Sequence, residues 1–164
     1  MKNMNLLNKA LCLTGILALS LLLSNCTKKF TDSTTCKNKN LKATADGNAF
    51  ESCVITVVPY ATFNWIQAGK DNDQIHLYIP RKTGTFALGD TSAYSAVFNK
   101  DFGKSSGKSL GTDSLHSGTV TITSCDVANK TISGTFSFSA IQKSPAGGTA
   151  TANITNGTFA DIKW

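Results

Sequence analysis

Apolar and polar residues alternate along most of the chain from Leu41 to Trp164, where Thr, Val, Ile and Phe are interleaved with small polar residues. An alternation with a period of two places successive side chains on opposite faces of a β-strand. No stretch of this region keeps apolar residues at the i, i+3, i+4, i+7 spacing of an amphipathic helix. The pattern therefore predicts an all-β domain, either a single antiparallel β-sandwich or a small flattened β-barrel.

Turn residues divide this region into strands. Asp46-Gly47 predicts a tight hairpin after Leu41–Ala45. Proline cannot donate to a sheet ladder, so Pro59 ends the next strand. Residues 101–113, rich in Gly, Ser and Lys, predict a surface loop. Further strands are predicted at 53–58, at 62–68 with Phe63 and Trp65 on one face, at 74–79 with Ile75, Leu77 and Ile79 inward and His76 and Tyr78 outward, and at 93–99.

The C-terminal third predicts a meander. Its strands are expected at 117–125, 131–141, 149–155 and 158–164, with turns at 126–130, at 145–148 and at Asn156-Gly157. Phe159 and Ile162 cannot share a face in a regular strand, which indicates a bulge near Ala160-Asp161.

A short motif recurs within the predicted strands. Gly-Thr followed by apolar, polar and apolar residues begins at Gly84, Gly118 and Gly134, and Gly157-Thr158-Phe159 begins in the same way. The spacing is irregular, so the motif is not a solenoid repeat. We interpret it as a local β-strand pattern in which glycine permits a bend or bulge, threonine faces solvent and the apolar residue enters the core.

The only long apolar run lies near the N-terminus, from Ala10 to Leu23, and basic residues precede it. Its 14 residues are too few to cross a bilayer, which takes about 20, but they are typical of a secretory signal. Leu23-Ser24-Asn25-Cys26 resembles a bacterial lipobox, although Asn25 stands where a small residue is usual. An ordinary signal peptide cut after Ser20 would leave three leucines at the mature N-terminus. We therefore expect residues 1–25 to be a lipoprotein signal peptide and Cys26 to carry the lipid.

The charge of the chain is unevenly distributed. The formal net charge is +6, yet from Ala43 onward nine basic residues face nine acidic ones. The excess lies in the signal and in residues 27–42, where five lysines accompany a single aspartate. A nearly neutral domain argues against nucleic acid as a partner. We expect residues 26–40 to be a lipidated cysteine followed by a flexible basic tether. Residues 41–164 are predicted to form the β domain.

Three cysteines remain after processing and lipidation, namely Cys36, Cys53 and Cys125. An odd number in an oxidising compartment leaves one free thiol, and three pairings are possible. Cys53 and Cys125 both lie in strand-like sequence, so they are the favoured disulfide. No spacing of Cys and His suggests a zinc site, and no metal ligand or cofactor site is predicted.

Four segments carry a resemblance to a known family. They are L-K-A-T-A-D-G-N-A-F at 41–50, S-G-T-V-T-I-T at 117–123, T-I-S-G-T-F-S-F-S-A at 131–140 and I-T-N-G-T-F-A-D-I at 154–162. With the lipobox, they resemble an uncharacterised family of Bacteroidota lipoproteins built on a domain of unknown function. The resemblance implies lipidation and an all-β fold, and it carries no catalytic residues.

Catalytic signatures are weak throughout. Gly103 to Ser109 invites a P-loop interpretation, but only three residues separate Gly103 from Gly107 where the motif needs four. The two histidines, His76 and His116, lack a nucleophile elbow or a metal-ligand spacing. We therefore expect a protein that is not an enzyme.

Two hypotheses for function remain open. In the first, a lipid-anchored, non-catalytic binding or scaffolding module of the cell envelope presents its sheet and loops to a protein or a glycan. In the second, a small β-barrel carries an apolar ligand in its interior. A packed interior favours the first and an open apolar cavity the second. The basic Thr27-Lys28-Lys29 after the anchor predicts an outer-membrane lipoprotein that faces the periplasm, since surface-displayed lipoproteins of this phylum tend to be acidic there.

Overall fold

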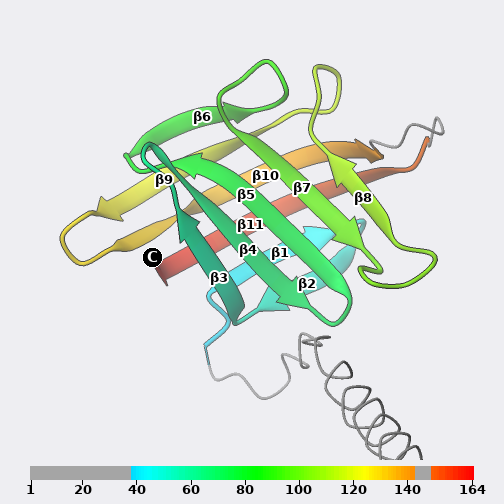
Figure 1. Cartoon of the computed structure of the whole chain (residues 1–164), viewed down its shortest axis with the longest axis horizontal. Coiled ribbons are helices and arrows are strands. Elements are labelled where there is room, and N and C mark those ends of the chain that lie inside the picture. The colour runs from blue at the N-terminus through cyan, green and yellow to red at the C-terminus, as the bar shows by residue number, and fades with distance from the viewer. Residues whose placement is uncertain (1–37, 143–148) are drawn as a thin grey trace, which may run out of the picture.

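The computed structural model describes residues 38–142 and 149–164, and the regular elements there are all β-strands (Figure 1). No helix in this part of the chain is long and apolar enough to cross a membrane. The strands are β1 (Leu41–Ala45), β2 (Asn48–Ser52), β3 (Val54–Pro59), β4 (Phe63–Lys70), β5 (Asp73–Pro80), β6 (Gly84–Leu88), β7 (Ser95–Lys100), β8 (Lys108–Gly111), β9 (Gly118–Asp126), β10 (Thr131–Gln142) and β11 (Thr151–Lys163).

The strands form one antiparallel sheet that curls into a nearly closed, barrel-like shape. Its order is β2-β1-β11-β10-β8-β7-β5-β4-β3, with β9 bonded to β10 and β6 bonded to β9. In Figure 1 the strands β3, β4, β5, β7 and β8 cross over β1, β9, β10 and β11. The β2 end of the sheet meets β4, the strand next to the other end, where the Ser52 hydroxyl donates to the Gly69 carbonyl at 2.6 Å. The prediction of an all-β antiparallel fold is confirmed, in the form of a barrel.

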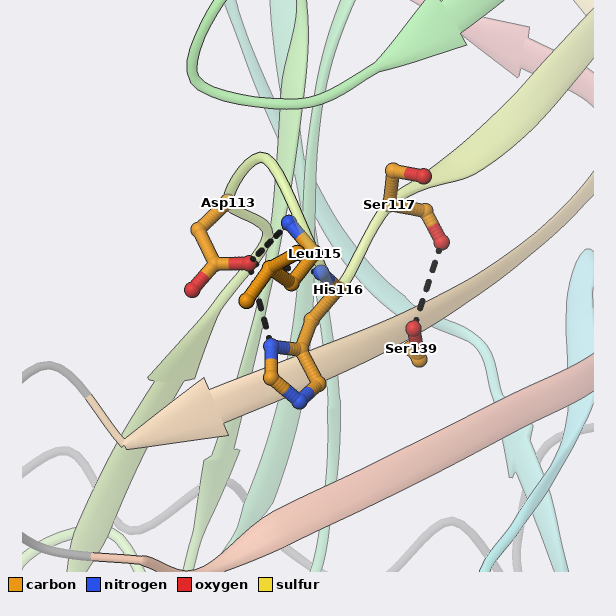
Figure 2. Close-up of polar contacts among 5 residues, drawn as sticks. All are labelled: Asp113, Leu115, His116, Ser117 and Ser139. Carbon is orange, nitrogen blue, oxygen red and sulfur yellow. Dashed lines mark hydrogen bonds and ion pairs between the residues drawn. The ribbon is translucent and has the colours of Figure 1, made fainter.

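The sheet forks along β10. Its first part pairs with β9 as far as Phe138, whereas Ile141 and Gln142 pair with β8. At the fork, the Ser139 amide donates to the Ser117 carbonyl at 3.1 Å. The Ser139 hydroxyl donates to the same carbonyl at 3.4 Å (Figure 2).

One carboxylate orders the loop that leads to this fork. The Asp113 Oδ1 accepts from the amides of Leu115 and His116 at 2.9 and 2.6 Å, and it lies 3.0 Å from His116 Nδ1 (Figure 2). The Asp113 amide in turn donates to the His116 carbonyl at 2.8 Å. Side-chain bonding of this kind is typical of Asp at a turn.

The inward faces of the strands fill the interior of the barrel. On β5, Ile75, Leu77 and Ile79 are fully buried while His76 and Tyr78 point outward, as the alternation predicts. Because aliphatic and aromatic side chains from all parts of the sheet join one continuous core, burial of their apolar surface is the main force holding the barrel together. The largest fully buried hydrophobic side chains are Phe98, Phe159, Leu41, Ile66, Ile75, Leu77, Ile79, Leu88, Ile122, Ile132 and Ile154.

The Gly-Thr motifs pair with one another across neighbouring strands. β6 pairs with β9, β9 with β10 and β10 with β11, so that Gly134 faces Phe159 and Gly157 faces Phe136. A Cβ atom on Gly157 would lie 2.6 Å from Phe136 Cδ2. Glycine is required because the ring of the next motif packs directly over its Cα. The threonines face solvent, and Thr85, Thr121, Thr135 and Thr158 lie in one row across four strands.

β11 departs from a regular strand twice. Ile132 pairs with Ile162 and Gly134 with Phe159, so that β11 holds one extra residue there, and Asp161 has a φ of 48°. This confirms the bulge predicted at Ala160-Asp161. The turn predicted at Asn156-Gly157 is wrong, because β11 runs unbroken through both residues and absorbs Asn156, with a φ of 53°, as a second bulge.

The predicted loop at 101–113 is also partly wrong. Residues Lys108–Gly111 form β8, in which Leu110 is buried opposite Phe98 of β7. A strand of four residues with a single large apolar side chain has too little local pattern to be read from the sequence. The strand β8 forms because residues 108–111 pair with β7 and β10.

Candidate functional site

A row of five rings crosses the outer face of the sheet from the loop after β3 to the middle of β5. Ring centroids are 4.5 Å apart for Tyr60 and Phe63, 6.4 Å for Phe63 and Tyr78, 5.8 Å for Tyr78 and Trp65, and 5.6 Å for Trp65 and His76. The Trp65 and Tyr78 rings are nearly parallel, with an interplanar angle of 6°. We call these five residues the aromatic row.

Strand register builds the row. Trp65 and Tyr78 face each other directly across β4 and β5, and their chain neighbours Ile66 and Leu77 point into the core. Cross-strand aromatic pairs of this kind add stability beyond their buried area, by about 0.5–1.5 kcal/mol. Because all five rings lie on the solvent side, they are not part of the core, and Tyr60 remains 44% exposed.

The row leads into a surface groove of about 540 Å³. Trp65, His76 and Tyr78 line it from β4 and β5. Phe102 and Lys104 line it from the segment between β7 and β8, and Lys108 lines it from the start of β8. We call it the aromatic groove. It lies on the outer wall of the barrel, not in the packed interior, so the side chains that line it are free of the constraints of core packing.

Backbone contacts hold the segment from Asp101 to Gly107 against the β4–β5 hairpin. The Phe102 amide donates to the Asn72 carbonyl at 2.6 Å, and the Asp101 amide donates to Asp73 Oδ1 at 2.9 Å. Within the segment, the Gly107 amide donates to the Lys104 carbonyl at 3.0 Å. A Cβ atom on Gly107 would lie 2.9 Å from that same oxygen, so only glycine fits this turn. This side of the groove is thus built on main-chain hydrogen bonds.

A polar cluster lies beside the rings on the same outer face. Gln74 and Asn99 are only 2% and 6% exposed. The Gln74 Oε1 is approached by Asn99 Nδ2 at 3.3 Å, by His76 Nε2 at 3.2 Å and by Gln67 Nε2 at 3.5 Å. The Asn99 Nδ2 also lies 3.4 Å from His76 Nε2, so the two amide nitrogens and the imidazole nitrogen crowd around one amide oxygen, which has two lone pairs.

Burial sets the ionisation of the titratable rings at the site. It lowers the pKa of His76 from its ordinary value of 6.5 to about 4, so the imidazole is neutral at pH 7. Burial, together with the nearby Tyr60, raises the pKa of Tyr78. Both rings therefore take part as neutral hydrogen-bonding and stacking groups.

Two side chains on β4 have unsatisfied polar atoms. The Trp65 Nε1 is buried and has no hydrogen-bond partner in the described part of the chain, and the same holds for both amide atoms of Asn64. Asn64 is fully buried on the inward face, whereas Trp65 lines the groove. A buried donor without a partner costs about 1–3 kcal/mol, which makes the indole N–H of Trp65 a group that a ligand or a water could satisfy.

The favoured disulfide between Cys53 and Cys125 is wrong, because Cys125 is a free cysteine while Cys53 is disulfide-bonded. Cys53 lies between β2 and β3, whereas Cys125 lies in β9, whose partners are β6 and β10. Strand character alone cannot say which strands become neighbours. The predicted lipidation site, Cys26, and the predicted signal peptide lie outside the described residues.

Two other features considered in the sequence lie in different places. His116 is bound to the turn carboxylate Asp113 (Figure 2), whereas Gly103, Lys104, Gly107, Lys108 and Ser109 line the aromatic groove. Within residues 38–142 and 149–164, no group of three or more His, Cys, Asp and Glu side chains could hold a metal ion.

The sequence predicted which aromatic side chains face outward, but not that they come together in one groove. The alternation placed Phe63 and Trp65 on one face, and it placed His76 and Tyr78 outward. The available signal was that aromatic residues occupy the solvent side of two successive strands. The contribution of Asn99 and Phe102 depends on the pairing of β7 with β5, which no local pattern reveals.

Together these features define a small barrel-like β-domain with an aromatic groove on its outer wall. The chain belongs to the family of the domain of unknown function DUF6252, whose family model matches residues 37–163. The comparisons with curated proteins and with solved structures returned no match. Membership of this family assigns no activity to the chain.

Proposed function

We propose that this protein is a non-catalytic binding module of the cell envelope and that its ligand, a glycan, binds along the aromatic groove. The observation that carries the proposal is the row of five outward-facing rings that ends in the groove. Apolar and aromatic side chains gathered on a surface, with polar groups placed among them, are typical of ligand sites.

A glycan suits both chemical components of the site. The apolar C–H face of a sugar ring packs against an aromatic ring, and its hydroxyl groups exchange hydrogen bonds with amide and imidazole groups. Rings at Trp65 and Tyr78 supply the first contact, and the amides of Gln67 and Asn99 supply the second. The length of the row, which continues to Tyr60, favours a chain of sugar units over a single one.

The packed interior of the barrel favours a binding site on the outer wall over a barrel that carries an apolar ligand inside. Side chains such as Phe98, Phe159 and Ile154 occupy the interior and belong to one packed core. A lumen filled in this way holds side chains instead of a ligand. The groove on the outer wall is therefore the better place for a binding site.

The proposed location follows from the N-terminal sequence. Lipid chains on Cys26 would anchor the domain at about 0.8 kcal/mol per buried methylene, and Lys28 and Lys29 would lie against anionic lipid. We place the domain on the periplasmic side of the outer membrane. Protease added to intact cells should leave the domain whole, and its degradation while periplasmic markers survive would place it on the cell surface.

Glycan binding can be tested by calorimetry of the full chain against a panel of soluble neutral and acidic polysaccharides. Trp65→Ala and Tyr78→Ala should each weaken binding by about tenfold or more, which corresponds to about 1.4 kcal/mol. Leu115→Ala is the matched control, because Leu115 is 86% exposed and does not line the groove. Unfolding midpoints of all variants separate lost contacts from lost folding.

The proposal fails if no polysaccharide of the panel binds. It also fails if binding survives in the well-folded Trp65 and Tyr78 variants. Tyr60→Ala, at the exposed end of the row, extends the test to a residue that contributes little to the core.

A further inference from the structure

Several hydrogen-bond donors lie in the aromatic groove or directly beside it. The amide nitrogens of Gln67 and Asn99 carry four hydrogens between them, and their acceptors in the cluster are the oxygen Gln74 Oε1, which has two lone pairs, and the ring nitrogen His76 Nε2 beside Asn99. The indole N–H of Trp65 has no partner in the part of the chain that the structure describes. A ligand rich in acceptor oxygens would satisfy these donors, because unmade hydrogen bonds at a buried site are costly.

The charges that line the groove are of one sign. Lys104 and Lys108 are its charged lining residues, and His76 beside them is neutral at pH 7. Lys104 lies 2.8 Å from Asp101, which neutralises part of its charge, whereas no carboxylate of the described residues forms an ion pair with Lys108. Lys100, the cross-strand partner of Lys108, lines a different groove together with Asp71 and Asp73, so the positive charge of the aromatic groove comes from Lys104 and Lys108.

This positive charge is local. From Ala43 onward the numbers of basic and acidic residues are equal, so a general excess of lysine on the domain does not explain it. A neutral sugar gains only hydrogen bonds from an ammonium group, whereas an acidic ligand also gains a charge–charge attraction in a cationic cleft.

We infer that the aromatic groove binds an acidic saccharide, whose sugar rings stack along the aromatic row and whose carboxylate or sulfate groups lie at Lys108 and Lys104. The inference rests on the glycan-binding function proposed above and names the class of glycan. The aromatic rings supply contact area that is insensitive to salt, and the lysines supply selectivity for the acid group.

The test compares one polymer in two charge states. Calorimetry of the full chain with polygalacturonate should show binding, and the same polymer after methyl esterification, which removes the charge and keeps the sugar, should bind at least tenfold more weakly. Dextran sulfate, which carries sulfate groups and no carboxylate, distinguishes a sulfate from a carboxylate preference. Raising the salt concentration from 50 to 500 mM should weaken binding of the acidic polymers, because exposed charges are screened.

Single substitutions then assign the effect to the groove. Lys108→Ala should weaken binding of the acidic polymer by about fivefold and leave the esterified polymer unaffected, and Lys108→Arg should retain binding. Lys163→Ala removes an exposed lysine elsewhere on the sheet and should change nothing.

Two outcomes would overturn the inference. Equal binding of the acidic and esterified polymers, lost in Trp65→Ala, would leave glycan binding standing and show that the acid group is irrelevant. Binding of poly-glutamate, with no binding of any polysaccharide, would show that the groove takes an acidic peptide, and the proposed function would then fail as well.

Discussion

Gly134 on β10 and Phe159 on β11 face each other so closely that a Cβ atom on the glycine would lie 2.7 Å from Phe159 Cζ. The same imagined atom would also clash with the Thr121 carbonyl oxygen of β9. Gly134 is therefore enclosed from both sides, by one neighbouring strand and by the ring that packs over it. Gly157 on β11 meets the ring of Phe136 on β10 in the same way, so these two copies of the Gly-Thr motif each place a glycine under an aromatic ring of the other strand.

Gly134→Ala should lower the free energy of unfolding by about 1–3 kcal/mol, because overpacking a core of this density displaces side chains or backbone. Urea unfolding followed by tryptophan fluorescence measures the change. Gly89→Ala is the control, since its new Cβ would lie 3.4 Å from the nearest atom. Equal stability of Gly134→Ala and the native protein would show that the close contact with Phe159 is relieved at little cost.

The His76 imidazole should make stability depend on pH in a defined window. Its pKa is lowered by burial from 6.5 to about 4 in the folded protein, so between these pH values the unfolded chain binds a proton that the folded protein does not. The free energy of unfolding therefore falls as the pH drops from about 6.5 to about 4, and the effect of His76 levels off below that.

Unfolding measured at several pH values, with the difference taken between native protein and His76→Gln, isolates this contribution. His116→Gln, which removes the other histidine, should keep the decline. An unchanged pH profile in His76→Gln would contradict the burial of the imidazole.

Thiol chemistry should distinguish the two described cysteines. Cys125 is free and Cys53 is disulfide-bonded, so one thiol should react with maleimide in the unreduced protein, and Cys125→Ala should remove it. Burial raises the pKa of Cys125, with Asp126 acting in the same direction and Arg81 opposing it, so the reaction should be slow at neutral pH.

Peptide mapping should identify the partner of Cys53. We expect Cys36, because it is the remaining cysteine that serves neither the signal peptide nor the lipid anchor. A Cys53–Cys125 peptide would restore the pairing that strand character favoured. Loss of the disulfide should lower the free energy of unfolding by about 2–4 kcal/mol.

Cys26→Ser should release the protein from membranes, because serine cannot accept the thioether-linked lipid. Partition between detergent and aqueous phases measures the change, and Cys12→Ser, inside the apolar run, is the control that should remain in the detergent phase. A Cys26→Ser protein that still enters the detergent phase would place the anchor elsewhere.

Local sequence was sufficient for the class of the fold. Alternation on β5 correctly placed Ile75 and Leu77 inward, and Asp46-Gly47 correctly marked the first hairpin, with φ angles of 49° and 81° at the two turn residues. The bulge at Ala160-Asp161 was predicted because Phe159 and Ile162 are three residues apart and could not otherwise face the same side of the strand. Each of these features depends on a few consecutive residues, because side-chain direction in a strand repeats every two residues.

Pairing between distant segments could not be read in this way. β1 pairs with β11, and the Asp46 carboxylate accepts a hydrogen bond from the Asn153 amide at 2.8 Å. Asn156 has the local signature of a turn, yet the two flanking strands hold it in a bulge. The closure of the barrel depends on the total burial that these long-range pairs achieve, which is a property of the whole chain.

The aromatic groove likewise depends partly on local sequence and partly on long-range strand pairing. Alternation within β4 and β5 sends Trp65 and Tyr78 to the solvent side, so their exposure was implicit in the sequence. Asn99 and Lys108 reach the site because β7 pairs with β5 and β8 pairs with β7. Local periodicity sets the face on which a side chain lies. Its neighbours from other strands are set by non-local packing, because residues far apart in sequence approach one another only in the folded sheet.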